Sequence, residues 1–145
     1  MREVKTSLEI HAPPDAVWEQ LLDKSRWGRF SDFCDLDPGR PIAAGATFTF
    51  GLKLLGLPAA PIRVRVLRFE PPRELCWVGA APGFRGEHYF RIDALEANRC
   101  RLTHGEYFSG PLGSLYDRLF HTTSTDTYAA FNVGLAMQAE RFKES

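Results

Sequence analysis

The stretch "RLTHGEYFSG" (101–110), followed at once by "PLGSLYDRLF" (111–120), has the pattern of a strand that leads directly into a helix. Alternate side chains of a strand face the same way, so Leu102, His104, Glu106 and Phe108 share one surface. From about Pro111 to 143 the apolar residues recur at helical spacing. Whether His104 and Glu106 point into water or toward this long helix decides what they can do.

The segments before this stretch predict one sheet and two short helices. "VKTSLEIHA" alternates and predicts a first strand at about 3–11. "PPDAVWEQLLD" begins a helix, because proline suits the first turn and Val17, Trp18, Leu21 and Leu22 form an apolar stripe. "SRWGRFSDF" spaces its three aromatic residues by three, which predicts a short second helix or turn with Trp27, Phe30 and Phe33 on one side.

The middle of the chain consists of alternating segments separated by turn residues. "ATFTFGLKL", "PIRVRVLRFE", "LCWVGA", "GEHYFRIDAL" and "RCRLTHGEYF" follow one another with short breaks, which is typical of an antiparallel meander. The order predicts an α+β fold: a curved antiparallel sheet of six to seven strands around a long C-terminal helix, with two short helices after the first strand. A helix lying over a curved sheet leaves a gap, and such a gap is a natural ligand chamber.

Composition bounds the class of protein. At 145 residues, 44% of them hydrophobic, the chain is expected to form a single domain over 1–145. Eighteen basic residues balance 18 acidic ones without a basic cluster, which argues against nucleic-acid binding. The charged start and the lack of a long apolar run predict a cytoplasmic protein without membrane insertion. Three cysteines without metal or disulfide spacing are expected to be buried small apolar residues.

The sequence resembles the START-like, Bet v 1-like (SRPBCC) superfamily, in its polyketide cyclase/dehydrase-type branch. The resemblance lies in "IHAPPDAVWEQLLD", "FEPPRELCWVG", "GEHYFRID" and "RLTHGEYFSG" followed by the long helix, and it covers nearly the whole chain in order. It implies a helix-grip fold with a deep, largely apolar cavity between the sheet and the C-terminal helix. Members include carriers, receptors and cyclases, so the resemblance implies a cavity rather than one activity.

If Leu102 and Phe108 face the helix, His104 and Glu106 lie on the cavity wall. His88 shares a face with Phe90 and joins the pair if the strand register is favourable. Three roles are then open to His104 and Glu106: a purely structural hydrogen bond, a polar anchor for an apolar ligand, or general acid/base catalysis. No metal and no cofactor is expected, because no local metal-ligand or phosphate-binding motif occurs.

Large aromatic residues mostly form cores, but a subset of them would line the chamber of a grip fold. The candidates that join His88, His104 and Glu106 as ligand contacts are Trp27, Phe30, Phe48, Phe50, Trp77, Phe90, Phe108, Thr123, Thr127 and Phe131. The threonines come from "HTTSTDTY" (121–128), which is either a kink or a helical turn that offers hydroxyls to the ligand. "LKLLGLPAAP" (52–61) is either an ordinary hairpin or part of the cavity rim.

Two functions remain after these considerations. The first is a domain that binds a small hydrophobic molecule, such as a lipid, a polyketide or an aromatic metabolite, in the cavity. The alternative is a polyketide cyclase/dehydratase-like enzyme that uses the same cavity, with His104 and Glu106 as the acid/base pair. Neither the ligand nor homodimer formation follows from these residues.

Overall fold

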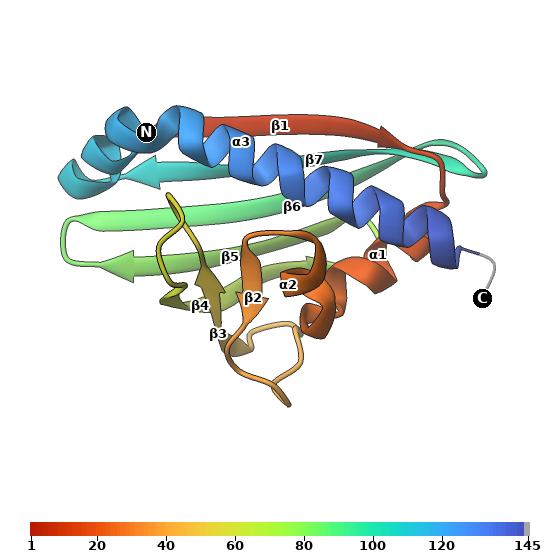
Figure 1. Ribbon diagram of the computed structural model, residues 1–145, viewed down its shortest axis with the longest axis horizontal. Coiled ribbons are helices and arrows are strands. Elements are labelled where there is room, and N and C mark those ends of the chain that lie inside the picture. The colour runs from red at the N-terminus through yellow and green to blue at the C-terminus, as the bar shows by residue number, and fades with distance from the viewer. Residues whose placement is uncertain (144–145) are drawn as a thin grey trace.

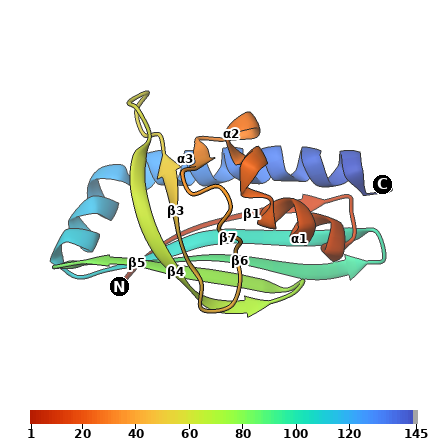
Figure 2. The ribbon, with the colours of Figure 1, turned by 90° about the horizontal axis from the view of Figure 1, so that it is seen from below.

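A single antiparallel sheet organises the computed structural model, which describes residues 1–143. Its strands are β1 (Arg2–Ile10), β2 (Phe33–Asp35), β3 (Thr47–Leu52), β4 (Ala60–Glu70), β5 (Glu74–Ala81), β6 (Phe84–Glu96) and β7 (Arg99–Ser109), in the order β1-β7-β6-β5-β4-β3-β2. The sheet curls so that β4 and β3 rise beside the long helix (Figure 2). The predicted α+β helix-grip fold is confirmed, with seven strands.

The long helix α3 (Pro111–Phe142) lies across β1, β7 and β6 (Figure 1). Gly110 has a φ of 80°, and this left-handed conformation turns the chain from β7 into the helix. Phe120 has non-helical angles (φ −120°, ψ 16°), so α3 is kinked one residue before the threonine-rich stretch. The predicted kink is therefore present, but it lies just before residues 121–128, which are themselves helical.

Three short helical segments follow β1: α1 (Pro14–Leu22), the 3-10 helix η1 (Lys24–Arg26) and α2 (Trp27–Phe30). Pro14 stands in the first turn of α1, which buries Val17, Trp18 and Leu21. The aromatic spacing predicted a short helix or turn, and α2 is such a short helix; it ends at Phe30, and Phe33 begins the edge strand β2. Phe33 stacks on Phe50 of the neighbouring strand, and this pairing fixes it in the sheet.

The core lies between the concave face of the sheet and the helices. Trp27 is fully buried at its centre and makes ring contacts with Phe33, Phe48, Phe50, Trp77 and Phe131. Its indole Nε1 donates a hydrogen bond of 3.0 Å to the carbonyl oxygen of Leu21, which satisfies its one polar atom. Trp27 is therefore held in place by the core itself.

Candidate functional site

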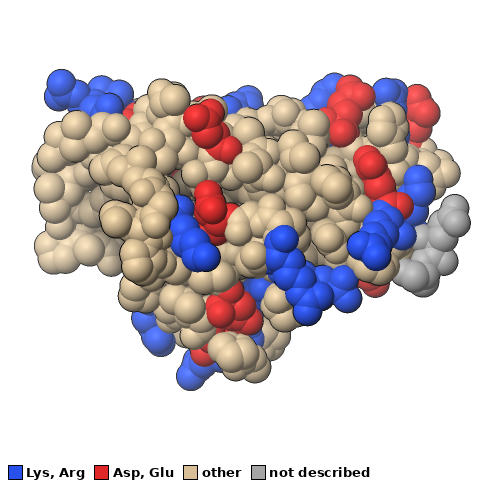
Figure 3. All heavy atoms as spheres, viewed as in Figure 1, with Lys and Arg blue, Asp and Glu red and all other residues tan. Residues whose placement is uncertain are grey.

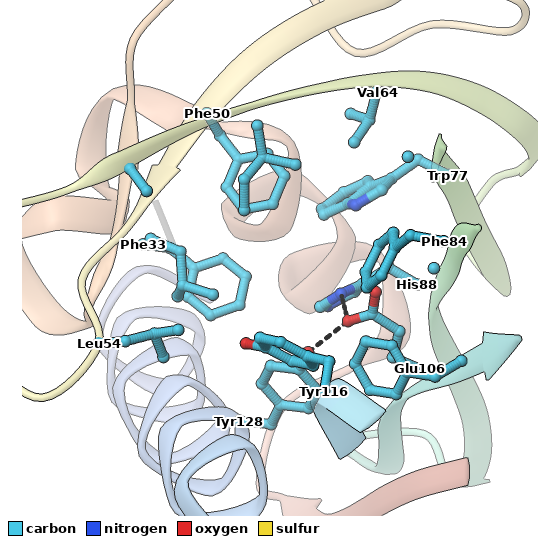
Figure 4. A pocket seen from close by; sticks show the side chains of 16 residues that line it. Phe33, Phe50, Leu54, Val64, Trp77, Phe84, His88, Glu106, Tyr116 and Tyr128 are labelled. Carbon is cyan, nitrogen blue, oxygen red and sulfur yellow. Dashed lines mark hydrogen bonds and ion pairs between the residues drawn. The ribbon is translucent and has the colours of Figure 1, made fainter. Parts of the chain in front are cut away.

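A cavity of about 240 Å³ lies between the sheet and the first half of α3 (Figure 4). Five strands contribute to it through residues spaced by two, which therefore face the same side of the sheet. They are Phe50 and Leu52, Ile62 and Val64, Trp77 and Gly79, Gly86 and His88, and Glu106 and Phe108. The remaining lining residues are Phe33, Leu54, Ala60, Phe84, Tyr116 and Tyr128.

The surface around the β3–β4 loop and the start of α3 is apolar. Leu55 and Leu57, in the β3–β4 loop, and Leu112 and Leu115, at the start of α3, are exposed. Leu55 directly follows the lining residue Leu54 in the sequence, and Leu115 directly precedes the lining residue Tyr116. Figure 3 shows the left end of this face, where α3 begins, mostly without charge. Acidic and basic side chains gather along the middle and the right end. An apolar molecule reaching the cavity thus meets apolar side chains first.

Glu106 is the one carboxylate among the side chains that line this cavity. Its partner across β6 and β7 is His88, and the Nδ1 atom of His88 lies 3.1 Å from Oε1 of Glu106. The Tyr128 hydroxyl donates a hydrogen bond to the same Oε1. In Figure 4 both dashed lines end on this one oxygen. Within residues 1–143, no hydrogen bond to the other oxygen, Oε2, is found.

The polar chain continues behind the cavity wall. Nε2 of His88 lies 2.6 Å from Nε2 of His104, and Nδ1 of His104 lies 2.8 Å from Oδ1 of Asn132. The Asn132 amide donates to the Thr6 hydroxyl at 2.8 Å, and that hydroxyl donates to the His104 carbonyl at 2.7 Å. A continuous hydrogen-bonded chain therefore runs from β1 through α3 and β7 to the cavity.

Burial controls the ionisation of two members of this chain. Desolvation lowers the pKa of His104 well below its ordinary value, and the nearby His88 lowers it further, against the effect of the hydrogen bond to Asn132. His104 is therefore neutral at pH 7. Desolvation also raises the pKa of Tyr128 well above its ordinary value, with the negative charge of Glu106 adding to the effect. Tyr128 thus keeps its proton.

The structure brings some of the candidate residues together at the cavity and places others elsewhere. His88, Glu106, Phe108, Phe50 and Trp77 line it. His104 shares a face with Glu106, as expected, but it is fully buried and its two ring nitrogens contact His88 and Asn132. It does not reach the cavity, because the His88 side chain from the neighbouring strand and the Tyr128 ring pack against it.

Other candidates form the core that supports the cavity. Trp27, Phe48, Phe90 and Phe131 are fully buried, and none of them lines the cavity. Phe30 packs on Phe131, with 5.4 Å between the ring centroids. Thr127 is buried and Thr123 half-buried, and neither is a lining residue, whereas the next residue along the helix after Thr127, Tyr128, does line the cavity.

Tyr128 lines the cavity but is not among the residues predicted from the sequence. It stands three residues before Phe131 and seven before Leu135, so the apolar stripe of the helix extends back to it. That spacing is the signal that would have identified it. Tyr116 and Phe84 were missed as well, because their approach to the cavity depends on the kink and on the β5–β6 hairpin. Leu54 and Ala60 do line the cavity, so the 52–61 loop forms part of its wall.

Burial also sets the ionisation of two of the three cysteines. Burial raises the pKa of Cys76 to about 12 and that of Cys100 to about 11, so both thiols stay protonated at neutral pH. Among residues 1–143, no group of three or more His, Cys, Asp or Glu side chains is arranged to hold a metal ion. No helix in the same range is both long and apolar enough to cross a membrane.

The fold recurs in solved structures of low sequence identity. A hypothetical protein of Helicobacter pylori has a TM-score of 0.78 at 18% identity, over 95% of this chain and 88% of its own. An aromatase/cyclase from Streptomyces sp. R1128 has a TM-score of 0.74 at 19% identity, over 97% and 94%. A START superfamily protein from Mycobacterium smegmatis has 0.69 at 14%, over 96% and 97%.

Two comparisons of sequence complete the assignment. No curated protein gives a significant match. The family model described as polyketide cyclase/dehydrase and lipid transport matches residues 1–140. This match covers all seven strands and nearly all of α3. The chain therefore belongs to the polyketide cyclase/dehydrase and lipid transport family.

Proposed function

We propose that the protein binds a small hydrophobic molecule, such as a lipid, a polyketide or an aromatic metabolite, in the cavity between the sheet and α3. The observation that carries the proposal is an apolar cavity with one carboxylate on its wall, whose Oε2 atom has no partner within residues 1–143. Apolar walls supply affinity, at roughly 2.5 kcal/mol per 100 Å² of buried apolar surface. The carboxylate would fix the orientation of the bound molecule.

Gly79 offers a way to fill the cavity without disturbing the sheet. It lines the cavity, and a Cβ added there meets Val64 Cγ1 at 3.5 Å and the Arg63 carbonyl at 3.6 Å, which are ordinary contacts. We expect Gly79→Leu to lower the affinity for 2-naphthol, a small aromatic probe, by about tenfold or more, since the lost contact area is worth over 1 kcal/mol. Isothermal titration calorimetry measures the affinity.

Gly79→Ala is the matched control, because it adds only the Cβ and leaves most of the cavity open. It should bind 2-naphthol more tightly than Gly79→Leu does. A folded Gly79→Leu protein that binds the probe as well as the wild type would place ligand binding outside this cavity. Native mass spectrometry of the freshly purified protein, followed by extraction, would identify any molecule that it carries.

Acid/base catalysis is a second candidate function, supported by the contact between His88 and Glu106 at the cavity wall. Glu106, rather than His104, would touch the substrate, and His88 would be its proton-sharing partner. With an enolisable ketone such as 2-tetralone, Glu106 would take a proton from the carbon beside the carbonyl. The electron pair of that C–H bond would move toward the carbonyl oxygen, and a deuteron from D₂O would later return to carbon.

We expect this deuterium exchange to fall by about a hundredfold or more in Glu106→Gln, because an amide is a far weaker base than a carboxylate. Proton NMR in D₂O follows the exchange. Glu19→Gln is the control, since Glu19 is exposed on α1 and does not line the cavity. Equal exchange in the wild type and in Glu106→Gln would rule out this catalytic role and would leave the binding proposal standing.

A further inference from the structure

We infer that the cavity selects ligands whose polar end donates a hydrogen bond, namely alcohols, phenols and other hydroxyl compounds, and that it discriminates against ethers and carboxylates. The inference rests on the proposed binding function and specifies its ligand class. It follows from the donors and acceptors along the chain Thr6–Asn132–His104–His88–Glu106, which leave Oε2 of Glu106 as an acceptor only.

The His104 carbonyl oxygen fixes the direction of the first hydrogen bond in this series. The His104 carbonyl can only accept, so the Thr6 hydroxyl spends its single proton on it. The same hydroxyl must then accept from Asn132, which requires the NH₂ group of the amide to face Thr6. The amide oxygen of Asn132 therefore faces His104. This orientation is fixed by the hydrogen bonds rather than by the similar shapes of the two ends of an amide.

The orientation of Asn132 determines the tautomer of His104. Because the amide oxygen only accepts, Nδ1 of His104 must carry the proton. His104 is fully buried and neutral, so its Nε2 has a lone pair and no proton. Nε2 of His88, 2.6 Å away, must therefore donate to it. The hydrogen bonds that begin at the Thr6 hydroxyl on β1 therefore fix Nε2 of His88, on the cavity wall, as a donor.

One proton remains to be placed between His88 and Glu106. If it sits on Nδ1 of His88, the pair is an imidazolium and a carboxylate. If it sits on Oε1 of Glu106, the pair is neutral, and Oε1 still accepts from Tyr128. Oε2 carries no proton in either arrangement. The cavity selects the same ligand chemistry wherever this proton lies.

The surroundings of Oε2 strengthen this selectivity. Oε2 lies against Gly86, since a Cβ added at Gly86 would overlap it. The other polar side chains that line the cavity are His88 and Tyr128, already engaged with Oε1, and Tyr116. Among residues 1–143 no Lys or Arg lines the cavity, and His88 is already paired with Oε1, so a ligand carboxylate beside Glu106 finds no cation of its own to pair with.

The test is a titration at pH 7 with four probes of one ring system: 2-naphthol, naphthalene, 2-methoxynaphthalene and 2-naphthoate. We expect 2-naphthol to bind about tenfold or more tightly than 2-methoxynaphthalene, since the hydrogen bond to a carboxylate exists only for the hydroxyl. The 2-naphthoate anion should bind more weakly than naphthalene. Equal affinity for 2-naphthol and its methyl ether, or tighter binding of the anion, would overturn the inference while leaving the binding function intact.

A substitution at Glu106 tests the acceptor directly. Glu106→Leu has no acceptor at the position of Oε2, so the preference for 2-naphthol over the ether should fall below about threefold in this variant. An unchanged preference in a folded Glu106→Leu protein would show that Glu106 is not the group that accepts the hydrogen bond of the ligand.

Gly86→Ala covers the case in which Glu106→Leu does not fold. Its methyl group displaces Oε2 without changing the chemistry of Glu106, so it should also weaken the preference for 2-naphthol. An unchanged preference in folded Gly86→Ala would contradict the assignment to Oε2. If the wild type bound none of the four probes, the proposed function would fall, and the inference with it.

Discussion

Replacing Trp27 with alanine is expected to lower the free energy of unfolding by about 3–5 kcal/mol, the usual range for a large aromatic residue removed from a core. Trp27 is fully buried among Phe33, Phe48 and Phe131. Its loss also leaves the Leu21 carbonyl without the indole donor. Urea denaturation at pH 7, followed by circular dichroism, measures the change.

Leu55→Ala is the control for this prediction, because Leu55 is exposed in the β3–β4 loop and its truncation should change stability by less than about 0.5 kcal/mol. A Trp27→Ala protein that is nearly as stable as the wild type but no longer binds 2-naphthol would show that Trp27 contacts the ligand. The structure instead makes Trp27 a support for the cavity wall, through its ring contacts with Phe50 and Trp77.

Acidification is expected to destabilise the protein through His104. The pKa of this side chain is depressed well below its ordinary value in the folded state, whereas the unfolded chain takes up a proton near pH 6.5. Below that pH the unfolded state binds more protons, so the stability present above pH 6.5 is lost as the pH falls. The contribution is about 1.4 kcal/mol per pH unit until the folded pKa is reached.

Urea denaturation at pH 7.0, 6.0 and 5.0 measures this dependence in the wild type and in His104→Gln. The wild type should lose up to about 1.4 kcal/mol more per pH unit than the variant, which has no titrating group at this position. His11→Gln, which replaces an exposed histidine, should keep the wild-type slope. Equal slopes in the wild type and His104→Gln would mean that His104 takes up its proton in the folded state as readily as in the unfolded chain.

The sequence predicts the fold well because its elements depend on local patterns. Alternation identifies the strands, and helical spacing identifies α3, so neither requires knowledge of distant contacts. The exceptions mark where tertiary contacts override local spacing. Phe33 follows the helical spacing of Trp27 and Phe30, yet it joins the sheet, because stacking on Phe50 and pairing with Leu52 bury it there.

The site is less predictable, because it depends on register and on the kink in α3. Alternation places His104 and Glu106 on the inner face, but only the pairing of β6 with β7 sets His88 opposite Glu106 and Phe90 opposite His104. Thr123 and Thr127 share one face of a regular helix, but the helix presents Tyr128 to the cavity instead. The side chains of Asn132 and Thr6 meet although they are 126 residues apart, which no local pattern reveals.

A crystal structure of the protein with 2-naphthol tests the central claim most directly, because it shows both the location and the orientation of a bound hydroxyl compound. The ring should lie in the cavity, packed against Trp77 and Phe50, with its oxygen within hydrogen-bonding distance of Oε2 of Glu106. The hydrogen bonds of Oε1 to His88 and Tyr128 should persist. A naphthol bound outside the cavity, or inside it with the hydroxyl pointing away from Glu106, would contradict the account.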